Sequence, residues 1–263
     1  MKPPVLVLHV TGTNRDRDAA RACELAGGAP EIVHVNALAE TPRRLLDYRM
    51  LVLPGGFSFG DDLGAGKVWA LTLGTLLGDV MAEFVTAGYP VIGICNGFQA
   101  LVKAGYLPGI GPLPTPGATV RQAATLTHND SGRFECRWVA LTPDPESPCV
   151  FTRDLDEPIV CPVAHGEGKL VASPAVLREI ARDHLAPLYY VPTPGDAAGY
   201  PGNPNGSAQH IAALTNPTGT ILGLMPHPED HVVPTQRPDR GSGPGAGLGL
   251  ALFERGVSYA AQV

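Results

Sequence analysis

Four short apolar runs, each followed by a polar turn and a stretch of helical character, occupy the first hundred residues of the chain. The runs cover residues 5–10, 32–35, 50–54 and 90–95. Continuous apolar segments of this length, rich in branched side chains, indicate strands that are buried on both faces. Helical spacing follows the first run in RDRDAARACELAGG, and residues 67–87 form a longer stretch predicted to be helical. Strands that alternate with helices predict right-handed crossovers and an open, doubly wound, mostly parallel α/β sheet.

The second half of the chain is less regular. The segments ATLTHN, RFECRWVALT and EPIVCPVA predict strands without clear crossover helices between them, so a β-rich excursion, mixed or antiparallel, is expected. Ser173 and Pro174 predict the start of a helix that Pro187 ends. Two further strands, HIAALTN and TGTILGLM, are expected to meet at the turn formed by residues 216–219. No internal repeat or linker is evident, and a single domain over residues 1–263 is the simplest expectation.

Charge and cysteine content exclude several classes of protein. The net charge of −6 leaves no basic excess to neutralise phosphates, so nucleic acid is not an expected partner. The longest uncharged run, residues 84–102, contains Gly88, Pro90, Asn96 and Gln99, which argue against a membrane span. Five cysteines form an odd, widely spaced set without a CxxC pair. This usage is typical of a reducing compartment, and the cytoplasm is the expected location.

The strongest chemical signal is the pentapeptide GICNG, which places Cys95 between the fourth strand and its helix. A glycine-flanked nucleophile at a sharp strand-to-helix turn is the pattern of a nucleophile elbow, here with cysteine. Flanking side chains would collide with neighbouring backbone at such a turn, and the helix N-terminus favours negative charge on the sulfur. The alternative is a buried apolar cysteine with two incidental glycines. The position after a strand and before a helix favours the elbow.

A thiol nucleophile needs a base, and the segment MPHPE offers one at the end of an apolar strand. His227 is the candidate base, because catalytic groups in open α/β sheets gather at the carboxyl ends of strands. Glu229 lies two residues on, so in an extended segment its side chain would point to the same side. A carboxylate there orients the imidazole and stabilises its protonated form. The alternative is a polar loop with a surface histidine and glutamate.

A glycine pair follows the third strand in PGGFSFGDD. Paired glycines can turn a backbone N–H toward a developing oxyanion, and the Asn96 N–H at the elbow would be a second donor. An ordinary tight turn is the alternative.

Other patterns are weaker. Neither Cys161 with His165 nor His227 with His231 has standard metal-ligand spacing, so no metal is expected. Residues 11–14, TGTN, could hold a phosphate as FMN proteins do.

With these pieces in place, the chain resembles the class I (triad) glutamine amidotransferases. The general motifs are GICNGFQAL and PHPE. Three more specific motifs, LPGGFSFGDDLGAGK, NDSGRFE and VAHGEGK, make it similar to the glutaminase subunits of phosphoribosylformylglycinamidine synthase in purine biosynthesis. The resemblance covers essentially the whole chain. The loops at residues 110–116 and 234–247 look longer than the family minimum.

The resemblance implies a flavodoxin-like fold and a Cys95, His227 and Glu229 triad. Backbone N–H groups of Gly56 and Asn96 are the implied oxyanion donors. Gln99 matches the position that contacts glutamine, and the segment around Arg133 is expected to help bind glutamine or face a partner.

The implied partner is the synthetase subunit, which would take ammonia from this chain and carry ATP and magnesium, and a small accessory subunit is also allowed. No cofactor is expected in this chain, which has no nucleotide-binding motif of its own.

Two rival interpretations remain open at this point. One is a flavodoxin-like cysteine hydrolase or deglycase, which shares the elbow but typically lacks the PHPE segment. The other is a non-catalytic module that binds a flavin or acts as a regulator. Glutaminase activity with a partner separates the first rival from the amidotransferase, and a flavin-loaded preparation would favour the second.

Overall fold

A six-stranded sheet forms the centre of the computed structural model, which describes residues 2–115, 122–191, 199–238 and 247–263. Its strands run in the order β10, β11, β4, β3, β1, β2. All neighbours pair in parallel except β10 with β11, which are antiparallel. The order β2–β1–β3–β4–β11 is that of the flavodoxin-like fold, so the predicted fold class is confirmed. The strands are β1 (Pro4–His9), β2 (Ala29–His34), β3 (Met50–Leu53), β4 (Val91–Ile94), β10 (Ala213–Thr215) and β11 (Ile221–Leu224).

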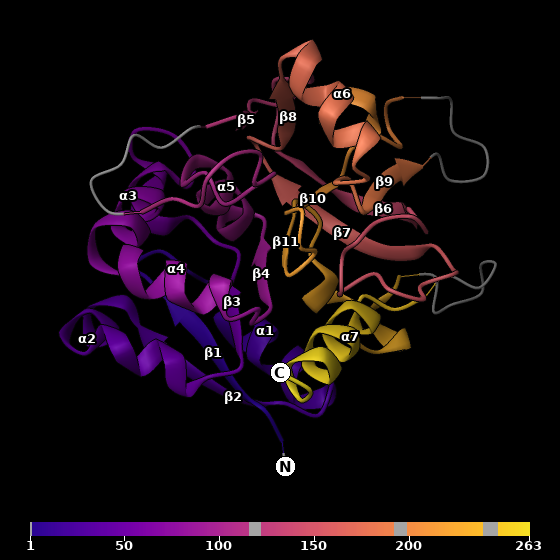
Figure 1. Cartoon of the computed structure of the whole chain (residues 1–263). Helices are drawn as coiled ribbons and strands as arrows, with labels where there is room; N and C mark the ends of the chain where they lie inside the picture. The colour runs from indigo at the N-terminus through magenta and orange to yellow at the C-terminus, as the bar shows by residue number, and fades with distance from the viewer. Residues whose placement is uncertain (1, 116–121, 192–198, 239–246) are drawn as a thin grey trace.

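Helices lie on both sides of this sheet (Figure 1). One group joins α1 (Asp16–Leu25) to α7 (Leu250–Ala260), and α7 also contacts β3. A second group contains α3 (Lys67–Leu76), α4 (Gly78–Thr86) and α5 (Asn96–Lys103), and α5 packs on β4 and β11. A short helix, α2 (Val35–Glu40), follows β2. Every residue of β3, β4 and β11 is buried, as the continuous apolar runs predict.

The expectation of one long helical stretch over residues 67–87 is wrong in one respect. The chain bends by 84° between α3 and α4, with Leu77 at the junction. The bend lets both helices pack on the molecule, and Trp69, Leu73, Met81 and Phe84 are all fully buried. None of the helices in the described residues is alone long and apolar enough to cross a membrane, and this bent pair meets the criteria by length and composition only.

The β-rich excursion consists of antiparallel strands beside the main sheet, at the upper right of Figure 1. In one small sheet β5 (Ala124–Thr127) pairs with β8 (Lys169–Ala172), and in another β6 (Glu135–Pro143) lies between β7 (Ile159–His165) and β9 (Leu188–Val191). The predicted β5, β6 and β7 are confirmed. The four-residue strands β8 and β9 were missed because they are short and only partly buried.

The predicted helix after Ser173 is α6 (Pro174–Arg182), and the Ser173 hydroxyl caps it by accepting a hydrogen bond from the Val176 N–H. The two loops expected to be long lie partly outside the described residues. Residues 110–115 contain no helix or strand, and residue 116 is not described. Of residues 234–247, only 234–238 and 247 are described, and Pro234–Gln236 form a single 3-10 turn.

Candidate active site

Cys95 occupies a strained turn between β4 and α5. Its backbone dihedral angles are φ 50° and ψ −102°, a conformation that side-chain-bearing residues rarely adopt. Its N–H donates to the Leu224 carbonyl at the end of β11. A Cβ at Gly97 would lie 2.0 Å from the Leu53 carbonyl oxygen, so a side chain there would collide with the backbone of β3. The flanking glycine is therefore required by packing, and the predicted elbow geometry is present.

His227 and Glu229 follow β11, the strand next to β4. His227 Nδ1 lies 2.7 Å from Glu229 Oε1, and both side chains are almost completely buried. The local structure differs from the expectation of an extended segment. Residues Pro228–Asp230 form a 3-10 turn, and His227 stands at its N-terminus. The pair forms because the turn folds Glu229 back onto the imidazole.

The charge of the histidine is set by its neighbours. Burial alone lowers the pKa of His227, but the charges of Glu229 and Cys95 outweigh it and hold that pKa well above its usual value. The carboxylate can only accept a hydrogen bond, so Nδ1 carries a proton and Nε2 is the nitrogen that remains for chemistry. Within the described residues, no hydrogen-bond partner occupies Nε2.

Cys95 and His227 meet beside Gly55. A Cβ at Gly55 would lie 2.7 Å from Cε1 of His227 and 3.5 Å from Cβ of Cys95. One small volume therefore touches the Cys95 side chain, the His227 imidazole and the glycine pair. A residue with a side chain at position 55 would push the imidazole away.

A small pocket of about 140 Å³ opens over Cys95. Its walls come from the glycine-pair loop, the elbow helix and the end of β7; they are formed by Gly56, Phe57, Asp61, Ala65, Cys95, Gln99, Phe134, Ala164, His165, Gly166 and Glu167. Gly56 and Gln99, two of the predicted substrate-binding residues, therefore face the same space as the sulfur.

The side chain of Asn96 ties the loop to the elbow. Its Oδ1 accepts from the Ser58 N–H at 3.0 Å, and its Nδ2 donates to Asp61 Oδ1 and Gln99 Oε1. Gln99 Nε2 in turn donates to the Glu167 carbonyl at 2.7 Å. Both polar ends of the Gln99 amide are thus bonded within the protein. Contact between Gln99 and glutamine stays a prediction.

A cysteine elbow with a buried histidine–carboxylate pair at the edge of a flavodoxin-like sheet is the arrangement expected of a triad amidotransferase. The model of the CobB/CobQ-like glutamine amidotransferase domain matches residues 2–260. The chain belongs to this family.

Curated relatives of this amidotransferase match over its whole length. One, from Treponema denticola, is phosphoribosylformylglycinamidine synthase subunit PurQ, and it is 49% identical over 98% of this chain and 99% of its own. The subunit of the same name from Archaeoglobus fulgidus is 40% identical over 97% and 96%. Among solved structures, a chain in the PurLQS structure from Thermotoga maritima superimposes with a TM-score of 0.72, at 32% identity, over 98% of this chain and 99% of that one.

Arg133 does not lie with the other predicted site residues. Its side chain is exposed and borders a separate hollow of about 420 Å³ with Asp130, Ser131 and Tyr200. Its neighbour Phe134 is the residue that reaches the pocket of the amidotransferase. A role for Arg133 in glutamine binding or partner contact therefore stays a prediction.

Two aromatic residues at the pocket were not identified from the sequence. The rings of Phe57 and Phe134 stack with centroids 6.4 Å apart, and each side chain is about half exposed, at 48% and 54%. Phe57 comes from the glycine-pair loop, and Phe134 immediately precedes β6. Both lie inside the motifs PGGFSFGDD and NDSGRFE, so their membership of these motifs is the signal that could have identified them as pocket residues.

His165 was also missed as a pocket residue. Its Nδ1 lies 3.1 Å from Asn129 Oδ1. The amide nitrogen of Asn129 donates to the carbonyls of Arg133 and His165. Burial, together with the nearby charge of His227, lowers the pKa of His165 to about 3. The imidazole is therefore neutral at physiological pH. The same Asn129 oxygen accepts from the Gly168 N–H, so this asparagine joins NDSGRFE to VAHGEGK.

Two groups of three side chains in the described residues bring possible metal-ligand atoms within 4.8 Å of one another. Neither group contains the pairs that the sequence suggested. One consists of His227, Glu229 and Asp230 at the elbow, where the ion pair accounts for the first two.

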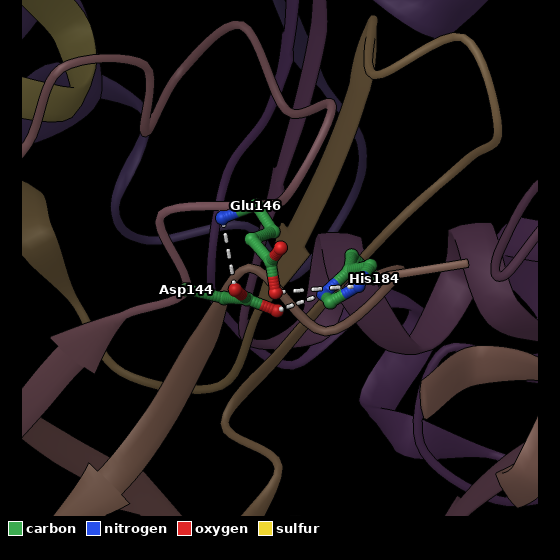
Figure 2. A group of neighbouring side chains, drawn as sticks. All are labelled: Asp144, Glu146 and His184. Carbon is green, nitrogen blue, oxygen red and sulfur yellow. Dashed lines mark hydrogen bonds and ion pairs between the residues drawn. The ribbon is translucent and has the colours of Figure 1, made fainter. Parts of the chain in front are cut away.

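The other group, Asp144, Glu146 and His184, is shown in Figure 2. Its His184 Nδ1 lies 3.0 Å from Asp144, and its Nε2 lies 3.6 Å from Glu146. The hydrogen bond to Asp144 raises the pKa of His184. Each ring nitrogen of His184 faces a different carboxylate, which is the arrangement of a charged histidine between two acids. Ion pairing therefore explains this group too.

Proposed function

We propose that this chain is the glutaminase subunit of phosphoribosylformylglycinamidine synthase. The observation that supports this proposal is that Cys95, at the end of β4, meets the buried His227–Glu229 pair, which follows the adjacent strand β11. In this pair, His227 Nδ1 and Glu229 Oε1 lie 2.7 Å apart. Relatives that carry this name and match at 40–49% identity over nearly the full chain support the assignment.

The reaction begins with attack of the Cys95 sulfur on the carboxamide carbon of glutamine. The carbonyl π electrons move to oxygen, and the backbone N–H groups of Gly56 and Asn96 stabilise the resulting oxyanion. When the tetrahedral intermediate collapses, the C–N bond breaks and His227 gives its Nε2 proton to the departing nitrogen, which leaves as ammonia. A thioester between Cys95 and the glutamyl group remains.

Hydrolysis of the thioester completes the cycle. The neutral His227 takes a proton from water as the water oxygen attacks the thioester carbon. Collapse of the second tetrahedral intermediate breaks the C–S bond and releases glutamate, and the thiolate and protonated imidazole are restored. Glu229 holds the imidazole in one tautomer throughout and stabilises its charged form.

Ammonia released here is used by the synthetase subunit, which on this proposal binds ATP, magnesium and formylglycinamide ribonucleotide. The PurLQS structure from Thermotoga maritima contains PurQ with PurL and PurS, which supports a synthetase partner and a small accessory subunit. The expected compartment is the cytoplasm, where the thiol of Cys95 stays reduced.

The test is Cys95→Ala in the reconstituted complex. Glutamine-dependent synthesis should be abolished, while synthesis from added ammonia continues at the wild-type rate because the synthetase has its own active site. Cys136→Ser is the matched control, since Cys136 is exposed and does not itself line the pocket. Full glutamine-dependent turnover by the alanine variant would refute the assignment.

A further inference from the structure

The loop between β1 and α1 runs alongside the glycine-pair loop. We call residues 11–15 the anchor segment and residues 55–59 the glycine loop. Four backbone hydrogen bonds join them. Phe57 N–H donates to the Gly12 carbonyl at 3.0 Å, and Phe59 N–H donates to Thr11 at 2.7 Å. In the other direction, the N–H groups of Asn14 and Arg15 both donate to the Gly55 carbonyl, at 3.4 and 3.3 Å.

These bonds also argue against the FMN-type phosphate site that residues 11–14 suggested. A phosphate cradle needs free backbone N–H groups. The Thr13 N–H is bound to the Val10 carbonyl, and the N–H groups of Asn14 and Arg15 are bound to Gly55. Three of the five backbone N–H groups of the anchor segment are therefore bound within the protein, which argues against a phosphate cradle there.

The pattern of bonds orients the Gly55–Gly56 peptide. Thr13 and Gly56 form an isolated antiparallel bridge, and the hydrogen bonds flank this pair rather than join it. In such a pair the N–H and C=O groups of both residues point away from the opposite strand. The Gly56 N–H therefore points away from the anchor segment. The same direction follows from the trans peptide, because the Gly55 carbonyl points toward the anchor.

On its other side, Gly56 lines the pocket over Cys95. No acceptor within the described residues takes the Gly56 N–H. It is thus a backbone donor held toward the pocket, at the place where the oxyanion would form.

The two segments touch with no space between their backbones. A Cβ at Gly12 would lie 2.0 Å from the Phe57 carbonyl oxygen and 2.8 Å from the Phe57 carbonyl carbon. Neither atom belongs to a flexible side chain, so the glycine loop would have to move. The contact is therefore sensitive to a single added methyl group.

We propose that the anchor segment is a positioning element for catalysis, with Gly12 as its essential residue. It fixes the Gly55–Gly56 peptide so that the Gly56 N–H points at the developing oxyanion. This inference rests on the proposed glutaminase function. It assigns a catalytic consequence to a loop that does not itself line the pocket.

The test is Gly12→Ala, studied in the assembled complex with Gly27→Ala as its control. Both glycines have nearly the same left-handed backbone, with φ of 95° and 92°, but the space around Gly27 is empty within 4 Å. The control therefore carries the same backbone strain without the collision. We expect Gly12→Ala to lower glutamine-dependent kcat by about two to three orders of magnitude, the effect of losing one oxyanion donor, with a small change in KM.

Two further measurements separate misplaced geometry from general damage. The γ-aldehyde of glutamate adds to a thiol to give a tetrahedral adduct, so its inhibition constant should rise for Gly12→Ala and stay near wild type for Gly27→Ala. Alkylation of Cys95 by iodoacetamide and assembly with the synthetase should be retained. A Gly12→Ala enzyme with the kcat and aldehyde affinity of Gly27→Ala would overturn the inference.

A milder variant serves if Gly12→Ala does not fold. Thr13→Val removes the hydroxyl that accepts the Val10 N–H at 3.3 Å and adds no bulk to the contact. Its glutamine-dependent kcat should fall about two- to tenfold, as for one net hydrogen bond, and an unchanged kcat would overturn the inference. Glutamine turnover by Cys95→Ala would instead refute the proposed function, so the two failures are distinguishable.

Discussion

Replacing Glu229 by glutamine tests how the buried carboxylate controls the site. The side chain keeps its shape and one acceptor oxygen for His227 Nδ1 but loses its charge. Burial then dominates the electrostatics of His227, because it already lowers the pKa of this histidine and only the charges of Glu229 and Cys95 outweigh it. The variant should therefore hold His227 neutral, and the Cys95 thiolate should lose its charged partner.

The magnitude follows from the geometry of the pair. A hydrogen bond of 2.7 Å between Nδ1 and Oε1 places the two charge centres about 4 Å apart, which corresponds to about 4 kcal/mol at an effective dielectric constant of about 20. Because about 1.4 kcal/mol changes a rate tenfold, this energy limits the loss of rate to about three orders of magnitude. Part of it is recovered by the remaining hydrogen bond. We expect kcat/KM for glutamine to fall by about one to three orders of magnitude.

Two assays on the assembled complex check this prediction. Steady-state glutamate release gives kcat/KM, and the rate of alkylation by iodoacetamide reports the thiolate. Alkylation is measured in a Cys136→Ser background because that thiol is exposed, whereas burial raises the pKa of the Cys23 thiol to about 12. Glu24→Gln, an exposed change on α1, is the control. Alkylation at neutral pH as fast as wild type, together with unchanged kcat/KM, would refute this account of the pair.

Two further predictions concern stability and regulation. Burial and then Glu229 raise the pKa of Asp230 to about 6, so the folded chain binds this proton more tightly than the unfolded chain. The resulting stability is present below about pH 4 and is lost as the pH rises through about 6. Asp230→Asn should therefore be more stable than wild type at pH 8, by less than about 2–3 kcal/mol because the carboxyl is partly exposed. Denaturant unfolding at pH 4 and 8 checks this, and an equal difference at both would contradict it. Separately, ammonia freed without an acceptor would waste glutamine, so the isolated chain should release glutamate slowly and the substrate-loaded complex much faster. Equal steady-state rates would contradict gating by the partner.

Much of the fold could be predicted because the buried strands are local in sequence. Apart from His9 at the end of β1, the runs at β1, β3, β4 and β11 are apolar and almost entirely buried, so composition alone identifies them. The edge strand β2 is weaker, with Ile32 41% exposed. The strands β8 and β9 have mixed burial over four residues each, and such short patterns do not separate a strand from a loop.

By itself, the sequence identified the candidate nucleophile and its turn. The glycines around Cys95 are local requirements of a sharp bend, and the PHPE segment carries both a base and a carboxylate. Only the tertiary structure decided how these groups are held. The anchor segment and the glycine loop lie forty or more residues apart in the sequence and are joined by backbone hydrogen bonds, which no side-chain pattern encodes. The elevated pKa of His227 likewise depends in part on the charge of Cys95, which folding brings from the end of another strand, and it is reached against the opposing effect of burial. Contacts between distant backbones and the loss of solvent arise only when the chain is folded.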